Sequence, residues 1–352
     1  MAKLPPAVAR LRAAVREGLD GLPPGSLVLV ACSGGPDSLA LADTVAFCAP
    51  RAGLRAGLVS VDHGLQDGSA ERAAAVADWA LGAGLDPAEA VRVEVGVDGG
   101  PEGAARAARY AALDAAAERH GAAAVLLGHT RDDQAETVLL ALVRGAGPRG
   151  IAGMRAVRGR YRRPLLGVAR TDTHAACAER GLKPWADPHN EDPRFLRSAL
   201  RPALDSLVAV LGEGLVANLA RTAALVGEDT DYLDAVALAA LDECRVAGAA
   251  GDGGSGIGGP GADGGASGDP SRGVSDRGEL DAKRLAALPG PVRTRALRAW
   301  VLESGVDGAE LNHRHLAAVD ALVADWRGQG PAFMPGGIEV TRADGRLRAL
   351  RP

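Results

Sequence analysis

Residues 33–38 combine glycines, hydroxyls and a carboxylate in a pattern typical of an anion-binding loop. They follow the apolar run 27–32 and precede a helical pattern that begins at residue 38. The glycines let the backbone approach a ligand closely, and free N–H groups at a helix start favour an anion. The hydroxyls can donate to phosphate oxygens, whereas the carboxylate would repel phosphate unless a cation lay between them, which suggests Mg²⁺. The predicted phosphate-binding residues are Ser33, Gly34, Gly35, Pro36, Asp37 and Ser38, with Asp37 as the metal ligand.

The loop differs from two common nucleotide-binding motifs. It lacks the GxxxxGK[ST] pattern, and therefore the lysine that holds the β- and γ-phosphates, and it also lacks GxGxxG. An ordinary strand-to-helix turn is the alternative interpretation of residues 33–38.

Two further polar groups follow apolar runs. Asp62 and His63 come after residues 58–61, and the alternative interpretation of this pair is a surface turn.

The segment 128–137, GHTRDDQAET, follows residues 123–127 and opens a helical pattern. Asp132 and Glu136 are four residues apart, so they share one face of the predicted helix. The acidic residues of this segment therefore predict a cluster that binds Mg²⁺ or the ammonium group of an amino acid. Capping of the helix N-terminus is the alternative. The candidate catalytic residues here are His129, Asp132, Asp133 and Glu136.

Residues 137–171 contain eight arginines and no acidic residue, although the whole chain has a net charge of −4. The codon bias of a GC-rich genome would explain why this stretch contains arginine rather than lysine. It would not explain why the stretch contains no acidic residue. The asymmetry predicts a polyanionic partner, most simply RNA, with a solvated basic face as the alternative. Arg194, Arg197 and Arg201 follow at spacings of three and four, which would place them on one helical face. The candidate arginines for this partner are Arg144, Arg163, Arg194, Arg197 and Arg201.

The elements that must position these residues alternate between strand and helix. This alternation predicts a Rossmann-like α/β fold with a parallel sheet, and ligands of such sheets bind beyond the carboxyl ends of the strands. Three polar groups at that edge therefore predict a single site. Ser69 is expected to cap the helix that it begins. The expected strands are 27–32, 58–61, 91–95 and 123–127, and the expected helices are 38–49, 69–81, 102–120 and 132–143.

Composition excludes several classes of protein. Of the 352 residues, 47% are hydrophobic and only 3% are aromatic, so a core of Ala, Val and Leu is expected. The acidic balance argues against a uniformly basic nucleic-acid coat. The four cysteines form no CxxC pair and indicate reduced cytosolic thiols. With no signal peptide and no apolar run that could span a bilayer, a cytoplasmic protein without a membrane partner is expected.

Pattern changes along the chain predict four segments. The expected catalytic domain covers residues 1–205, and a helical connector covers 206–247. The Gly-rich stretch 248–278 is expected to be a flexible linker. A small C-terminal α(+β) domain, 279–352, is expected to contain helices over 280–302 and 311–326 and a hairpin within 333–350.

The loop SGGPDS after an apolar strand resembles the pyrophosphate-binding loop of the N-type ATP pyrophosphatases, the PP-loop superfamily. The resemblance implies an adenine nucleotide alpha hydrolase type of fold. It also implies cleavage of ATP to AMP and pyrophosphate while a carbonyl oxygen is adenylated. In that superfamily the edge that carries Asp62 and His63 helps to hold the adenylate.

The order of motifs over about residues 25–205 closely resembles the tRNA(Ile)-lysidine synthetase family, and the segment from about residue 280 resembles that family's small tRNA-binding domain. Gln66 and Ser198 replace the arginine and asparagine usual in the family, and the Gly-rich stretch is not a family feature. The matching motifs are SGGPDS, VDHGL, EGAAR with Arg109-Tyr110, LGHTRDDQAETVLL, RGAGPRGIAGM, RRPLL and DPHNEDPRFLRSALR.

This resemblance implies a carbon–nitrogen ligase. Free L-lysine would be joined to C2 of the wobble cytidine (C34) of a CAU-anticodon tRNA(Ile), through an adenylated cytidine, with ATP and Mg²⁺ as cofactors. Asp132, Asp133 and Glu136 would serve lysine and metal, and Arg106 and Arg109 would hold phosphate or the cytidine. A homodimer, with a second copy of the chain as a partner, is one possible assembly. The alternatives are a PP-loop tRNA thiolase and a catalytically silent RNA- or nucleotide-binding module.

Overall fold

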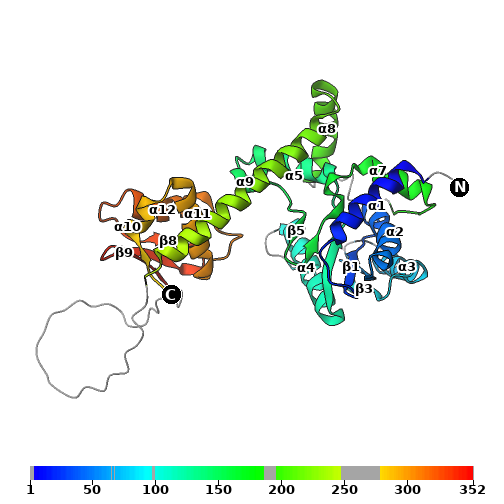
Figure 1. Cartoon of the computed structure of the whole chain (residues 1–352), viewed down its shortest axis with the longest axis horizontal. Coiled ribbons are helices and arrows are strands. Elements are labelled where there is room, and N and C mark those ends of the chain that lie inside the picture. Colours follow the sequence, from blue (N-terminus) through cyan, green and yellow to red (C-terminus); the bar gives the residue numbers. More distant parts are fainter. Residues whose placement is uncertain are drawn as a thin grey trace, which may run out of the picture. The chain divides into compact units, whose positions relative to one another are not determined.

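The computed structural model describes residues 4–64, 66, 68–96, 100–185, 196–246 and 278–351 (Figure 1). Most of the Gly-rich stretch and Arg194 therefore lie outside the described residues, as does the side chain of Arg197. The chain divides into two compact units, Met1–Gly227 and Glu228–Pro352. The four segments expected from the sequence stay predictions.

Six strands form one sheet in the described part of the first unit. Their order is β3 (Ala88–Arg92), β2 (Arg55–Asp62), β1 (Leu27–Ala31), β4 (Ala122–Leu127), β6 (Tyr161–Arg162) and β5 (Val157–Arg158). All neighbouring pairs except β5–β6 are parallel. In the register, Ala31 at the end of β1 pairs with Val59 on one side and with Leu127 on the other. The predicted α/β class with a parallel sheet is confirmed.

Helices connect these strands and extend the first unit beyond them. They are α1 (Pro6–Leu19), α2 (Pro36–Arg51), α3 (Ser69–Gly82), α4 (Gly100–His120), α5 (Arg131–Val143), α6 (Pro148–Ile151), the 3₁₀ turn η1 (Pro164–Gly167), α7 (Arg170–Glu179), α8 (Leu196–Leu211) and α9 (Leu215–Cys244), which continues into the second unit.

Alternate residues of the central strand face opposite layers, as the two-residue period of a strand requires. Val28 and Val30 are fully buried in a cluster with residues of α1, α2 and α7. Leu27 and Leu29 belong to a second cluster built with α4. Helices therefore cover both faces of the sheet, and its carboxyl edge stays between the two layers (Figure 1).

Two expectations for the elements of the first unit are wrong. The third strand covers Ala88–Arg92 rather than residues 91–95. Ser69 does not cap α3, because Gly68 occupies the cap position with φ +70°. The Ser69 hydroxyl instead hydrogen-bonds the Asp62 carboxylate at the end of β2, which helps to lower the pKa of Asp62.

The expected helical connector forms two helices in the structure. Gly212, with φ +95°, lies in the break between α8 and α9. Within the described residues, no helix taken singly has the length and apolarity to cross a membrane; α8 and α9 meet that test only as a pair bent by 102°.

The second unit packs helices on a small sheet of order β7-β10-β9-β8, as far as its residues are described. Trp300 is completely buried at its centre. The predicted hairpin is present: its turn holds Asp344 at φ +51° and Gly345 at φ +74°, as a two-residue type I′ turn requires. The expected helix over residues 280–302 is interrupted near Pro289. The elements are β7 (Leu280–Asp281), α10 (Ala282–Ala287), α11 (Gly290–Glu303), α12 (His313–Ala324), β8 (Ala332–Phe333), the 3₁₀ turn η3 (Pro335–Gly337), β9 (Glu339–Ala343) and β10 (Arg346–Leu350).

Candidate functional site

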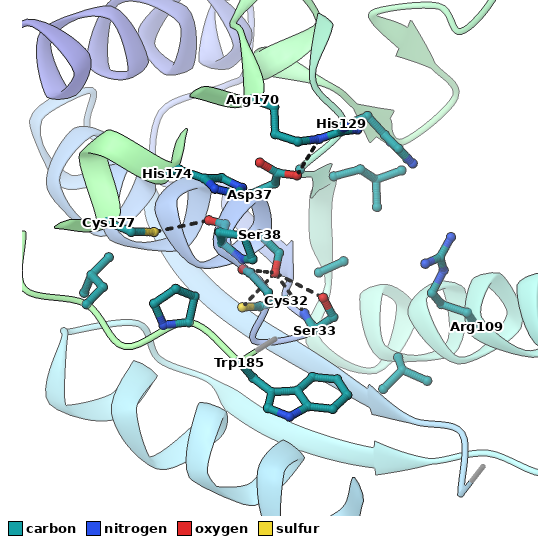
Figure 2. Close-up of a pocket in the computed structure, with 18 of the residues that line it drawn as sticks. Cys32, Ser33, Asp37, Ser38, Arg109, His129, Arg170, His174, Cys177 and Trp185 are labelled. Carbon is teal, nitrogen blue, oxygen red and sulfur yellow. Dashed lines mark hydrogen bonds and ion pairs between the residues drawn. The ribbon is translucent and has the colours of Figure 1, made fainter. Parts of the chain in front are cut away.

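A cavity of about 930 Å³ lies where β1, β2 and β4 end (Figure 2). The loop after β1 contributes Ser33 and Asp37, the segment after β2 contributes His63, and the segment after β4 contributes His129. The single site predicted from three strand ends is therefore present in the geometry. Of the other predicted residues, Gly35, Pro36, Ser38, Arg109 and Arg201 also line the cavity.

The loop at residues 33–38 is braced from within by a serine. The Ser38 hydroxyl accepts from the Ser33 N–H at 3.2 Å and donates to the Gly35 carbonyl at 3.0 Å. The Ser38 hydroxyl proton is therefore used in a hydrogen bond within the loop, whereas the sequence suggested that it would donate to a phosphate oxygen. Gly34 has φ +81°, which favours glycine, and Gly35 precedes α2 with no side-chain cap among the described residues. The uncapped end of α2 thus presents backbone N–H groups to an anion.

Gly128 allows β4 to approach this loop. A Cβ atom added at Gly128 would lie 3.0 Å from the Ser38 Cα and 3.1 Å from its backbone nitrogen. Because both neighbours are backbone atoms at the start of α2, a side chain at this position would displace the loop.

We expect Gly128→Ala to lower the free energy of unfolding by about 1–3 kcal/mol, the usual cost of overpacking. Urea unfolding of the variant measures this effect. Gly103→Ala is the matched control, since a Cβ there meets nothing within 4 Å and alanine is the better helix former. Equal stabilities of Gly128→Ala and wild type would show that the loop can move aside without cost.

Asp37 begins α2 and points toward Arg170 (Figure 2). The Thr173 hydroxyl donates to its Oδ1 atom, and the Arg170 Nε lies 3.8 Å from its Oδ2 atom. Burial raises the pKa of Asp37, and the nearby Asp133 carboxylate raises it further. The carboxylate is therefore poorly solvated and only loosely paired, which suits a group that receives a cation with its ligand.

Arg170, at the start of α7, joins the acidic residues of the third strand end. Its Nη2 atom lies 2.8 Å from the Asp133 Oδ1 and 3.0 Å from the Glu136 Oε1, and its backbone N–H donates to Asp132 at 2.8 Å. Arg201 of α8 adds a contact of 3.1 Å to Glu136, which is fully buried. The predicted acidic cluster is thus assembled, but here its charges are balanced by arginines.

Helix capping accounts for part of this acidic cluster. Asp133 and Thr130 form a reciprocal capping box at the start of α5. Over the residues that the structure describes, no group of three or more His, Cys, Asp or Glu side chains could hold a metal ion. Asp37, the metal ligand predicted from the sequence, is thus not part of such a group.

His129 is held neutral in a cationic environment. Burial lowers its pKa to about 3, Arg163, Arg109 and Arg106 act in the same direction, and Asp133 opposes them. Its buried Nδ1 atom has no hydrogen-bond partner among the described residues, and the same is true of His63. Both rings line the cavity, and the lowered pKa of each keeps it neutral beside a ligand at neutral pH.

We expect the imidazole NMR signals of His129 to stay constant between pH 8 and pH 5. A histidine with an ordinary pKa near 6.5 would change over that range. The same protein in denaturant, where the ring is solvated, is the control. A midpoint near 6.5 in the folded protein would contradict the buried cationic environment.

Tyr110 of α4 gathers three of the predicted arginines. The guanidinium of Arg106 lies 4.9 Å from the ring centroid and that of Arg109 5.7 Å, and both Arg106 and Arg163 reach the phenol oxygen, at 3.3 and 3.4 Å. Arg163 is buried and also donates to the Arg155 carbonyl at 2.9 Å. Arg109 faces the cavity from this group, opposite Asp37 (Figure 2).

Several of the arginines in residues 137–171 do not lie on the surface. Arg163 and Arg170 are bonded in the interior as described above, and Arg162 donates to the carbonyls of Gly18 and Asp20. Arg144, at the end of α5, is exposed and does not line the cavity. The exposed arginines of this stretch are Arg144, Arg149 and Arg158.

Comparisons with known proteins match both units. A family model described as a PP-loop domain matches residues 8–207, and one described as the TilS substrate binding domain matches residues 280–348. The tRNA(Ile)-lysidine synthase of Salinispora tropica is 54% identical over 358 residues, covering 100% of this chain and 99% of the relative. That of Thermobifida fusca is 51% identical over 346 residues, covering 97% of each chain.

A solved structure shares the fold. It is the U34-tRNA thiolase NcsA from Methanococcus maripaludis with its [4Fe-4S] cluster, with a TM-score of 0.53 and 18% identity. The match covers 63% of this chain and 80% of the thiolase chain. At this identity the similarity establishes the fold alone.

Proposed function

Because the chain belongs to the tRNA(Ile)-lysidine synthase family, we propose that it joins free lysine to C2 of the wobble cytidine of tRNA(Ile) with a CAU anticodon. ATP is converted to AMP and pyrophosphate in this ligation. The observation that carries the proposal is the convergence of three strand-end segments on one cavity, with the uncapped start of α2 at its edge.

The reaction requires activation of the cytosine ring. The C2 oxygen is a poor leaving group, so adenylation by ATP must precede attack by the lysine amine. The Ser33–Ser38 loop, with the N-terminus of α2, suits the triphosphate and then the pyrophosphate that departs. Arg109, on the opposite wall, suits a phosphate or the cytidine.

Asp37 would hold Mg²⁺ against the phosphates. Mg²⁺ commonly binds through one or two carboxylates together with substrate phosphates, and this arrangement fits a lone, desolvated carboxylate. When bound, the ion would offset the negative charge that develops on the phosphates.

Lysine must attack as a neutral amine, so a group in the cavity must accept a proton. With its pKa lowered to about 3, His129 is a weak base at neutral pH, so another group is expected to accept this proton. Asp132, Asp133 and Glu136 remain the proposed lysine-binding group. Since Arg170 contacts all three, the lysine ammonium would have to share or replace its contacts.

The second unit is proposed to select tRNA(Ile), consistent with its match to a substrate binding domain. Its separate hydrophobic core, around Trp300, would give this domain its own rigid surface.

A thiolase is the alternative within the same fold. Such enzymes use reactive cysteines, whereas all four cysteines of this chain are buried. Burial raises the pKa of Cys32, and it raises that of Cys177 to about 11, so both are protonated thiols at neutral pH. The cysteine environments therefore favour the ligase.

Nuclease digestion of tRNA(Ile), after incubation with enzyme, ATP and lysine, distinguishes the two activities. If the chain is the ligase, mass spectrometry of the digest should show a nucleoside whose mass exceeds that of cytidine by the mass of one lysine minus one water molecule. A sulfur-containing nucleoside, together with iron or zinc in the purified protein, would favour the thiolase.

A further inference from the structure

A second cavity, of about 360 Å³, opens beside the Ser33–Ser38 loop. Residues of α3 form one wall, and the segment after α7 forms another. We call it the tryptophan cavity, and its principal lining residues are Leu39, Arg72, Val76, Trp79, Lys183 and Trp185.

The lining combines flat aromatic surface with positive charge. Two of the four tryptophans of the chain are here, together with one of its three lysines. The guanidinium of Arg72 lies 4.1 Å from the ring centroid of Trp185. Among the described residues that line this cavity, none is acidic. Aromatic rings with neighbouring cations are the usual means of binding an unpaired nucleotide by stacking its base and pairing its phosphate.

The tryptophan cavity adjoins the cavity proposed for ATP and cytidine. Ser33, Leu182 and Trp185 line both. The backbone N–H of Trp185 donates to the Gly34 carbonyl at 2.9 Å, so the chain that carries this ring is attached to the phosphate-binding loop. In Figure 2, Trp185 and Arg170 lie on opposite sides of this loop.

We infer that the tryptophan cavity binds the base of the adenosine that follows the target cytidine in the CAU anticodon. The inference rests on the proposed function and makes this cavity a specificity site for the anticodon. Adjacent nucleotides of a single-stranded loop can enter neighbouring cavities when their bases are splayed apart. The chemistry of the lining suits a base with an attached phosphate. Adjacency limits the choice to the two nucleotides that flank the target cytidine, and the purine ring of the adenosine offers the wide surface that suits two tryptophans.

Two variants test the inference through the affinity for tRNA. Trp79→Leu removes a stacking surface that lines only the tryptophan cavity. Ala75→Trp fills the cavity from an exposed position of α3, so it should fold even if Trp79→Leu does not. Ala74→Trp is the matched control, because Ala74 is also exposed on α3 but does not line the cavity.

The dissociation constant is measured for tRNA(Ile) and for the same tRNA with an abasic site in place of that adenosine. Trp79→Leu and Ala75→Trp should each weaken binding of intact tRNA by about tenfold, the size of one lost base stack. The abasic site should weaken tRNA binding to wild type by a similar factor. In the variants, which already lack this stacking contact, the abasic site should change the dissociation constant little. Ala74→Trp should bind as wild type does.

The inference would be overturned if Ala75→Trp and wild type bound intact tRNA with equal affinity. It would also be overturned if the abasic site weakened tRNA binding by the same factor in the variants as in wild type. A rise in the KM for ATP without a change in tRNA affinity would assign the cavity to the adenine of ATP instead. A wild-type protein that binds tRNA(Ile) but forms no lysidine would refute the proposed function, whereas lysidine formation with indifferent variants would refute this inference alone.

Discussion

Replacing Asp37 with asparagine should slow tRNA-dependent pyrophosphate release from ATP by at least about a hundredfold, the usual cost of losing a group that stabilises developing charge. Asparagine has nearly the shape of aspartate and can still accept from Thr173. It lacks the charge that would hold Mg²⁺ at the start of α2. The affinity for tRNA should change less than twofold, because Asp37 lies at the phosphate loop rather than on the proposed RNA-binding residues.

The matched control is Asp43→Asn on the same helix. Asp43 is paired with Arg180 and does not line the cavity, so pyrophosphate release should stay close to wild type. Release by Asp37→Asn within about threefold of wild type would contradict the role given to this carboxylate. Loss of tRNA binding as well, with an altered circular dichroism spectrum, would show that the fold had failed instead.

Replacing Arg170 with glutamine should lower the free energy of unfolding by about 3 kcal/mol, because it leaves buried carboxylates without their cation. Arg170 is in contact with Asp133 and Glu136 and approaches Asp37. Arg201 also contacts Glu136, with its Nε atom 3.1 Å from the Oε1 atom, and the buried Oε2 atom has no hydrogen-bond partner among the described residues. Asp133 and Asp37 would therefore lose most in the variant, because Arg201 still pairs with Glu136. Urea unfolding of the variant at neutral pH measures the loss.

Arg180→Gln provides the comparison within the same part of the chain. Arg180 follows α7 and contacts Asp43 through two hydrogen bonds, but about half of its side chain is exposed. Exposed ion pairs contribute about 1 kcal/mol or less, so this variant should stay near wild-type stability. If both variants unfold at the same urea concentration, the buried network around Arg170 does not contribute as proposed.

Much of the catalytic unit could be predicted from the sequence because its signals are local. Apolar runs that end in polar residues mark the carboxyl edge of a parallel sheet, and residues 33–38, His63 and His129 meet there as expected. The error at Ser69 arises because a cap residue and the first helical residue look alike in sequence. Gly68 takes the left-handed conformation and frees the serine for Asp62.

Arg170 was missed as a site residue for a different reason. It is one of eight arginines in a stretch without acids, and no spacing in the sequence connects it with residues 132–136. Only the tertiary fold brings α7 beside the start of α5. The tryptophan cavity was equally hidden, since Trp79 and Trp185 lie 106 positions apart in the sequence and line one cavity only in the folded chain.

The most direct test of the account is transfer of labelled lysine to purified tRNA(Ile) with a CAU anticodon. We expect label in the RNA that depends on ATP and Mg²⁺, one lysine for each AMP and pyrophosphate released, and none when the wobble cytidine is replaced by uridine. No label in tRNA(Ile), across a range of magnesium and salt concentrations at which the protein is folded, would contradict the central claim.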